Sequence, residues 1–320
     1  MRVYRWDLDK TYLDTDFQSF RGIVRTATEP AHKKRALPGA AALLRALGTA
    51  PGASVMVVSG SPTQMRGVLS EKLRLDGIPF DELVLKDNVG NIRRGRFRAV
   101  KGQLGFKLPA LLSARARTEE SAKEVLFGDD VEADALVYSL YADVVAGHVG
   151  AAELSRVMEM AGAYPDEIDR ALESAVGIAP SAAVERVFIR QERGIPVHRL
   201  AALGPRVVPI RSWWQAALVL QQMGHLDARS TEAVMLRVFD EEGRDPWVMG
   251  ALAQDVARRG WVEPDLFSGL TGPDSLVEAV HRAVSSLGGR GVEKPPALEG
   301  SVDYLELLKT GAWTKHGRAE

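Results

Sequence analysis

The pattern of apolar and polar positions changes about halfway along the chain. In the first half, short continuous apolar runs alternate with segments of helical period. The expected strands are 3–6, 54–58, 83–85, 125–127 and 144–146, and the expected helices are 39–47, 62–75, 108–116 and 133–141. Strands that are apolar on both faces and separated by helices predict a parallel sheet covered on each side. Arg2 and Arg5 are unusual for a central strand.

After residue 150 the helical period dominates. The expected helices are 151–161, 165–175, 213–223, 230–239, 246–258, 275–286 and 301–308. Glycines break the pattern between several of them, and 288–296 reads as an extended connector. We therefore expect two domains: an α/β domain over residues 1–150 and a mainly α-helical domain over residues 151–320.

Composition narrows the class of protein. The chain has 320 residues, 46% of them hydrophobic, with 41 Lys and Arg against 42 Asp and Glu. It contains no Cys, which excludes disulfides, thiolate catalysis and cysteine-bound metal centres. No apolar run reaches the roughly 18 residues of a membrane span, and the first twenty residues are too acidic for a secretory signal. We expect a cytoplasmic protein without a transmembrane segment.

Two carboxylates stand where the first strand ends. Asp7 and Asp9 alternate in Trp6-Asp7-Leu8-Asp9-Lys10-Thr11, so both begin on the same face of an extended segment. Carboxylates this close repel each other, and a divalent cation relieves the repulsion. The end of a parallel strand is also where open α/β sheets bind ligands. Asp and Thr are equally common in turns and helix caps, which is the alternative interpretation.

The second strand ends in Ser59-Gly60-Ser61-Pro62, directly before a predicted helix. Backbone N–H groups there, together with the Ser59 hydroxyl, favour an anion site. A plain helix cap would use the same residues.

The strand 125–127 runs into Gly128 and then into four carboxylates within six residues, which are Asp129, Asp130, Glu132 and Asp134. Hard oxygen ligands at a strand end suit Mg²⁺, although acidic residues also favour helix N-termini. Lys107 stands before this strand, at a helix start, where its ammonium group could neutralise a phosphate or a carboxylate.

Together these four motifs, in this order, resemble those of the haloacid dehalogenase (HAD) superfamily in its phosphatase branch. The surrounding sequence resembles one subgroup, the catalytic domain of the actin-patch-associated phosphatidate phosphatases and their bacterial relatives, in the segments DLDKTYL, VSGSP and VLFGDDVEADALVYSLYADVVAG. The resemblance covers about residues 1–148. It implies a Rossmann-like HAD fold with a parallel sheet.

The resemblance also implies roles for the motif residues. Asp7 would be the nucleophile that forms an aspartyl-phosphate, and Asp9 would be the general acid and base. Thr11, Ser59, Gly60 and Lys107 would hold the phosphate, with Lys107 also restraining Asp7. Mg²⁺ would be bound by Asp7, Asp9, Asp129, Asp130 and Asp134. Two points stay open: Lys101 rivals Lys107 as the motif lysine, and either Asp129 or Asp130 could be the direct ligand.

The spacing of the motifs bears on the substrate. Only about 47 residues separate Thr11 from Ser59, and Ser59 from Lys107, which leaves no room for a full cap domain. An uncapped pocket admits a large substrate. The cluster 32–35 (HKKR) borders it in sequence, and a second basic cluster offers substrate contacts through Arg93, Arg94, Arg96, Arg98 and Lys101.

The expected function is therefore Mg²⁺-dependent hydrolysis of a large or membrane-surface phosphomonoester, with phosphatidate as the precedent of the subgroup and peripheral membrane contact as a consequence. One alternative is a phosphatase of nucleic acid ends or phosphoproteins, which the arginine cluster would serve equally. The other is a non-catalytic binding module on a HAD scaffold, with the helical half as its working part.

Overall fold

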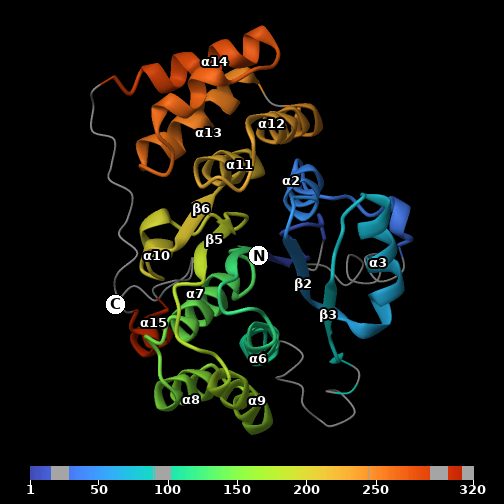
Figure 1. Ribbon diagram of the computed structural model, residues 1–320, viewed down its shortest axis with the longest axis vertical. Coiled ribbons are helices and arrows are strands. Elements are labelled where there is room, and N and C mark those ends of the chain that lie inside the picture. Colours follow the sequence, from blue (N-terminus) through green and yellow to red (C-terminus); the bar gives the residue numbers. More distant parts are fainter. Residues whose placement is uncertain (16–28, 89, 91–101, 244, 289–301, 312–320) are drawn as a thin grey trace.

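A six-stranded parallel sheet forms the centre of the computed structural model (Figure 1). The structure describes the chain except residues 16–28, 89, 91–101, 244, 289–301 and 312–320. The strand order is β3-β2-β1-β4-β5-β6. The bounds are Arg2–Asp7 (β1), Ala53–Pro62 (β2), Glu82–Lys86 (β3), Lys123–Asp129 (β4), Val184–Arg190 (β5) and Val207–Ile210 (β6). The predicted α/β fold with a parallel sheet, followed by a helical region, is confirmed.

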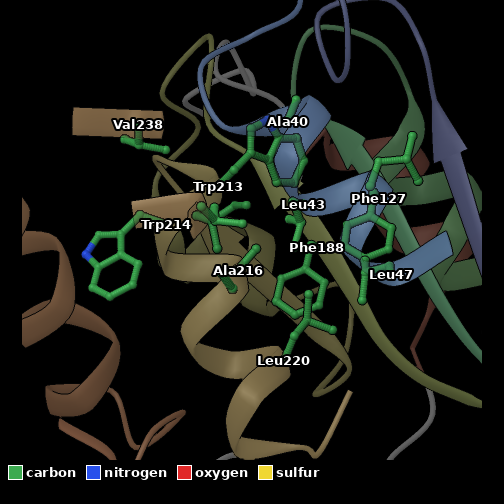
Figure 2. Packing of buried hydrophobic residues seen from close by; sticks show 14 of the residues in the cluster. Ala40, Leu43, Leu47, Phe127, Phe188, Trp213, Trp214, Ala216, Leu220 and Val238 are labelled. Carbon is green, nitrogen blue, oxygen red and sulfur yellow. The ribbon is translucent and has the colours of Figure 1, made fainter. Parts of the chain in front are cut away.

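One face of the sheet is covered by helices from both halves of the chain. They are α2 (Ala40–Gly48), α3 (Arg66–Leu75) and α11 (Trp213–Gln222), and further out lie α12 (Ala228–Glu242), α13 (Pro246–Arg258) and α14 (Asp274–Ser285). Figure 2 shows Trp213 of α11 gathered with Leu43 of α2 and Phe188 of β5. The ring of Trp213 lies 5.0 Å from that of Trp6 on β1. The late helices thus share a core with the strand that ends in Asp7.

The other face carries a second core. Its helices are α6 (Leu104–Ala116), α7 (Asp134–Val145), α8 (Ala151–Met160), α9 (Pro165–Val176), α10 (Val197–Ala201) and α15 (Tyr304–Thr310). Three short 3₁₀ segments complete the described elements: η1 (Ala31–Lys33), η2 (Thr63–Met65) and η3 (Pro264–Gly269). Among the described residues, no helix is long and apolar enough to cross a membrane.

The secondary structure differs from the prediction in several details: α3 begins at Arg66 and not at residue 62, α10 was not expected, and the other main differences concern strands. The strand expected at 144–146 is wrong, because residues 144 and 145 are the last turn of α7. Every residue of α7 is buried, so its sequence lacks the polar stripe that marks a surface helix. β5 and β6 were not predicted. β6 has only four residues, and Glu185 and Arg186 interrupt the apolar run of β5.

The missed strands bear on the expected domain boundary near Gly150. β5 pairs with β4 along its length, and β6 pairs with β5. Since strands of one sheet depend on each other's hydrogen bonds, we propose that the unit built around this sheet extends at least to Ile210, with the helical part following it.

Arg5 is accounted for by a buried ion pair. Its Nε and Nη2 donate to the two carboxylate oxygens of Glu124 on β4, both at 2.8 Å, and both side chains are at most 2% exposed. Tyr141 Oη donates to the same carboxylate at 2.6 Å, and Arg115 contacts it at 3.4 Å. Burial disfavours charge on Glu124, but Arg5 outweighs burial and holds the pKa of Glu124 below its usual range. Arg2 lies at the strand start and donates to the carbonyl of Gly224 at 2.8 Å.

Candidate active site

The sheet topology brings the predicted motifs together at the carboxyl ends of the strands. β1 lies between β2 and β4, and all three are parallel, so their carboxyl ends face the same way. Asp7 ends β1, Ser59 lies in the last part of β2, and Asp129 ends β4. All three side chains are fully buried. The strand ends thus meet as the sequence predicts.

Lys107, in the first turn of α6, completes this cluster. Its Nζ donates to Asp7 Oδ1 at 2.7 Å, to Glu132 Oε2 at 3.1 Å and to Asp134 Oδ1. Burial disfavours the ammonium charge, but the carboxylates of Asp134 and Asp7 outweigh it and raise the pKa of Lys107 well above its usual value. Its rival, Lys101, lies outside the described residues. The contacts with Asp7 favour Lys107 as the motif lysine.

An acidic group around Lys107 could hold a metal ion. One oxygen each of Asp7, Glu132 and Asp134 lie within 4.8 Å of one another. Asp7 Oδ2 and Asp134 Oδ2 are buried and have no hydrogen-bond partner among the described residues. Buried polar atoms are rarely left unpaired, and hard carboxylate oxygens suit a divalent cation. The donor set therefore fits such an ion.

The negative charges of these three carboxylates repel one another in the absence of a cation. Burial, with the neighbouring charge of Asp134, raises the pKa of Asp7 well above its ordinary value. Burial likewise raises the pKa of Asp134 to about 6. Three carboxylates share one lysine, so the group carries an excess of negative charge. Glu132 was not among the predicted ligands; the density of four carboxylates in six residues was its only signal in the sequence.

Asp9 lies in a different setting, held by two serines of β2. Ser59 Oγ and Ser61 Oγ donate to Asp9 Oδ2 at 2.8 and 2.9 Å, and Ser61 N donates to Ser59 Oγ at 3.0 Å. Asp9 Oδ1 is buried without a partner among the described residues. Burial raises the pKa of Asp9. The serines fix one oxygen of Asp9 and leave the other for chemistry. Ser61 is not a helix cap, because it belongs to β2 and α3 begins at Arg66.

Asp129 organises the turn after β4. Its Oδ1 accepts from the backbone N–H groups of Val131 at 2.5 Å and Glu132 at 3.1 Å, and its Oδ2 accepts from Thr11 Oγ1 at 3.2 Å. Burial, with the charge of Asp134, raises the pKa of Asp129 to about 8. Thr11, predicted to bind phosphate, thus links the turn after β1 to the turn after β4.

Asp130 is engaged elsewhere. Its Oδ1 accepts from the backbone N–H groups of Glu192 and Arg193 at 2.7 and 2.6 Å, and its Oδ2 accepts from Ile195 N at 2.8 Å. The carboxylate therefore anchors the loop after β5. Neither Asp130 nor Asp129 belongs to the group formed by Asp7, Glu132 and Asp134, so the choice between these two as the direct ligand stays a prediction.

Close packing at the site requires a glycine at position 128, and at position 60 it leaves room for a Cβ only if the end of the Gln103 side chain moves. A Cβ on Gly60 would lie 2.7 Å from Gln103 Nε2, and a Cβ on Gly128 would lie 2.7 Å from Asp134 Oδ2 and 2.8 Å from Tyr138 Cε2. The turn after β1 also holds Lys10 at a φ of 60°, which non-glycine residues seldom adopt. The backbone at positions 60 and 128 thus lies close to neighbouring side chains, and the turn after β1 adopts an uncommon conformation.

Two buried lysines near the site were missed as individual residues. Burial lowers the pKa of Lys34, while the charge of Asp9 acts in the opposite direction. Lys34 belongs to the basic cluster 32–35. Lys86 ends β3, donates to the carbonyl of Gly102, and has its pKa lowered to about 8 by burial. Its signal was its position directly after a predicted strand. The second basic cluster, with Arg93, Arg94, Arg96 and Arg98, lies outside the described residues.

Comparison with known families identifies the part of the chain that forms this site. Residues 6–154 match the family described as the phosphatidate phosphatase APP1, catalytic domain. A search of curated proteins and a search of solved structures each gave no match. The matched segment holds Asp7, Asp9, Ser59, Lys107 and the acidic turn after β4, while β5 and the late helices lie beyond it. Residues 6–154 thus match a HAD-like phosphatase family, and the enzyme class that this match supports is a phosphoric monoester hydrolase.

Proposed function

We propose that the protein hydrolyses a phosphomonoester through an aspartyl-phosphate formed on Asp7, with Mg²⁺ as its cofactor. One observation carries the proposal. Asp7 is held through Oδ1 by Lys107 at 2.7 Å, while its Oδ2 is buried and has no partner among the described residues. A nucleophilic oxygen needs this arrangement, because it must be oriented but not engaged.

In the first step, Asp7 Oδ2 attacks phosphorus and the bond from phosphorus to the leaving oxygen breaks. The leaving oxygen takes a proton from Asp9, whose Oδ1 is unengaged while Ser59 and Ser61 hold its Oδ2. In the second step, water attacks the aspartyl-phosphate, Asp9 takes a proton from that water, and inorganic phosphate leaves with Asp7 restored. Lys107, Ser59 and Thr11, with the backbone at Gly60, are the proposed contacts of the transferring phosphoryl group. To make these contacts, Ser59 and Thr11 would redirect to the phosphoryl group the hydroxyl protons that they donate to Asp9 and Asp129 in the free protein.

Asp7, Glu132 and Asp134 would hold the metal, and Asp129, which positions the backbone N–H of Glu132, would support them. A bound Mg²⁺ supplies neutralisation of the charge on the phosphoryl oxygens. This ligand set replaces Asp130 of the predicted set with Glu132, and it leaves the side chain of Asp9 to proton transfer.

The substrate we propose is a large phosphomonoester at a membrane surface, with phosphatidate as its model. The family description supports a lipid phosphate. The basic cluster 32–35 supports an anionic surface, because Asp14 N donates to the Arg35 carbonyl at 2.9 Å, which places this cluster beside the segment that follows the DxD turn. A peripheral contact of this kind uses lysine and arginine near anionic headgroups.

The test compares the Asp7→Asn variant with the Asp14→Asn variant. Asp14 lies on the same segment, but its side chain is 59% exposed. With Mg²⁺, Asp7→Asn should lower phosphate release by about 10³-fold or more, and Asp14→Asn should leave it unchanged. Acid-quenched wild-type protein should retain labelled phosphate, and Asp7→Asn protein should not. Full activity of Asp7→Asn would overturn the mechanism.

The substrate is tested separately from the mechanism. Phosphate release is measured on liposomal phosphatidate, on a 5′-phosphorylated oligonucleotide and on a phosphopeptide at equal phosphate concentration. We expect the highest kcat/KM on phosphatidate. A higher value on either of the other two would replace the lipid proposal while leaving the aspartyl-phosphate mechanism intact.

A further inference from the structure

A cavity lies at the amino-terminal ends of the strands, opposite to the active site at their carboxyl ends. It measures about 720 Å³ and is lined by the first residues of β4 and β5, by Arg206 before β6, and by the ends of α7 and α11. β5 has seven residues, so about 20 Å separates its two ends. The far end of β5 contacts the catalytic turn, where Arg190 Nη1 donates to the carbonyl of Lys10 at 3.4 Å. The cavity is therefore distinct from the catalytic cluster.

The walls of this cavity carry a positive charge. Lys123, Arg186 and Arg206 line it, and Glu185 is the single acidic residue among the described lining residues, which leaves a formal charge of +2 with His148 neutral. Glu185 is itself engaged, because its Oε2 lies 3.0 Å from Nε2 of His225. A carboxylate only accepts, so Nε2 donates to it, while Nδ1 lies within hydrogen-bond distance of Tyr4 Oη at 3.0 Å.

Arg186 has unused donor capacity at this wall. Its Nη1 donates to the carbonyl of Glu185 at 2.7 Å, and its guanidinium carbon lies 5.3 Å from the ring centre of Trp261. Its Nε is buried and has no hydrogen-bond partner among the described residues. An unmade hydrogen bond of a buried charged group is unfavourable, so Arg186 would gain from an additional acceptor.

Arg206 is held in place beside it. Its Nη1 donates to Asp143 Oδ1 at 2.8 Å, and Asp143 also accepts from Tyr304 Oη at 2.6 Å. The remaining donors of the guanidinium group are thus presented by a fixed side chain. Arg186 and Arg206 both line the cavity. Burial lowers the pKa of Arg186, and the charge of Arg206 acts in the same direction.

We propose that this cavity is a binding site for a small organic phosphate, whose dianionic group is held by Arg186 and Arg206. A dianion complements the positive charges of Lys123, Arg186 and Arg206. The planar guanidinium group also matches a phosphate in a bidentate geometry. Val184, Pro180 and Met223 give the cavity an apolar side for the organic part of the ligand. The volume lies within the usual range of small-molecule sites.

The experiment uses phenylphosphonate, a dianion whose carbon–phosphorus bond a phosphatase of this type does not cleave. Binding is measured by isothermal titration on the full chain, and the site is located by hydrogen exchange. We expect binding by the wild type, with amide protection in residues 180–187 and 206–208. Arg186→Gln should weaken the affinity about tenfold or more, since it removes charged hydrogen bonds.

A matched control is Arg282→Gln. Arg282 also stacks on a tryptophan, with its guanidinium carbon 4.8 Å from the ring centre of Trp247, but it lies outside the cavity. Its affinity should stay within twofold of the wild type. Lys123→Gln, an exposed substitution at the cavity rim, should weaken binding while leaving the circular dichroism spectrum unchanged. It keeps the test valid if Arg186→Gln does not fold.

Two outcomes would overturn the proposal. One is equal affinity in Lys123→Gln, Arg186→Gln and the wild type. The other is loss of both binding and protection in Asp7→Asn, which would place the probe in the catalytic pocket. Benzoate, a monoanion of similar shape, should bind more weakly than phenylphosphonate; equal or tighter binding would overturn the assignment to a phosphate.

Discussion

Two clusters of buried charge lie on the same pair of strands, β1 and β4, and they differ in how far their charges are satisfied. Arg5 and Asp7 alternate on β1, so both project from the same face of the sheet. Around Arg5, each oxygen of Glu124 accepts two hydrogen bonds. Around Asp7, three carboxylates share one lysine, and two carboxylate oxygens have no partner among the described residues.

The difference in hydrogen bonding indicates that one cluster contributes to stability and the other to function. A buried ion pair with all its hydrogen bonds made is a closed structural unit, and removing one member leaves an uncompensated charge. A buried group with excess negative charge and unpaired oxygens is unfavourable by itself, and it becomes favourable when a cation binds. The same strands therefore carry a structural cluster at the start of β1 and, in the proposed function, a reactive cluster at its end.

The largest expected effect concerns the structural cluster. Glu124→Leu leaves Arg5 buried and unpaired, so we expect a loss of about 3–5 kcal/mol in the free energy of unfolding. The double variant Arg5→Met/Glu124→Leu should recover most of that loss. Urea unfolding followed by circular dichroism measures both. An unfolding free energy of Glu124→Leu within 1 kcal/mol of the wild type, on the order of a surface substitution, would contradict the comparison.

Acid should weaken the same cluster. The pKa of Glu124 in the folded protein lies below its ordinary value of 4.5. The pair therefore contributes stability above about pH 4.5, and this contribution is lost as the pH falls through the folded-state pKa. In urea unfolding between pH 6 and pH 3, the double variant should lose less stability than the wild type. An equal loss in both proteins would show that other groups dominate acid unfolding.

The second effect concerns the reactive cluster. Lys107→Met removes the cation that orients Asp7, and we expect kcat/KM on an aryl phosphate to fall by about 10²–10³-fold. Lys72→Met is the matched control, because Lys72 pairs with Asp76 at 2.8 Å in α3, outside the catalytic cluster. Its kcat/KM should stay within twofold. If both lysine variants lose activity equally, Lys107 has no special role.

The contrast also explains how much could be predicted from the sequence. The alternation of strands and helices was readable because central strands such as β2 and β4 are buried on both faces and therefore continuously apolar. β5 was hidden by Glu185 and Arg186, two polar residues within the strand that line a cavity at the amino-terminal ends of β4 and β5. A local pattern carries no information about such a tertiary environment.

The site could be predicted as far as strand ends determine it. Asp7, Ser59 and Asp129 each end or nearly end a parallel strand, and topology then brings them together. The division of labour among Asp129, Asp130 and Glu132 could not be predicted, because it depends on partners elsewhere in the chain. Asp130 is fixed by backbone groups more than sixty residues away, in the loop after the strand that was missed.

The smallest effect that we expect is a shift in stability on Mg²⁺ binding, which distinguishes the role of Asp134 from that of Asp130. In the proposed function the folded cluster binds Mg²⁺ and the unfolded chain does not. Mg²⁺ should therefore stabilise the wild type, by about 2.7 kcal/mol at a concentration one hundred times its Kd. Asp134→Asn should abolish this Mg²⁺-dependent rise in Tm. Asp130→Asn should lower Tm, since it weakens the anchor of the loop after β5, yet it should keep the rise. Calorimetry with Mg²⁺ and with EDTA measures each shift. A rise that survives in Asp134→Asn and disappears in Asp130→Asn would reverse the assignment of the two residues. It would also show that the reactive cluster is completed by the loop after β5.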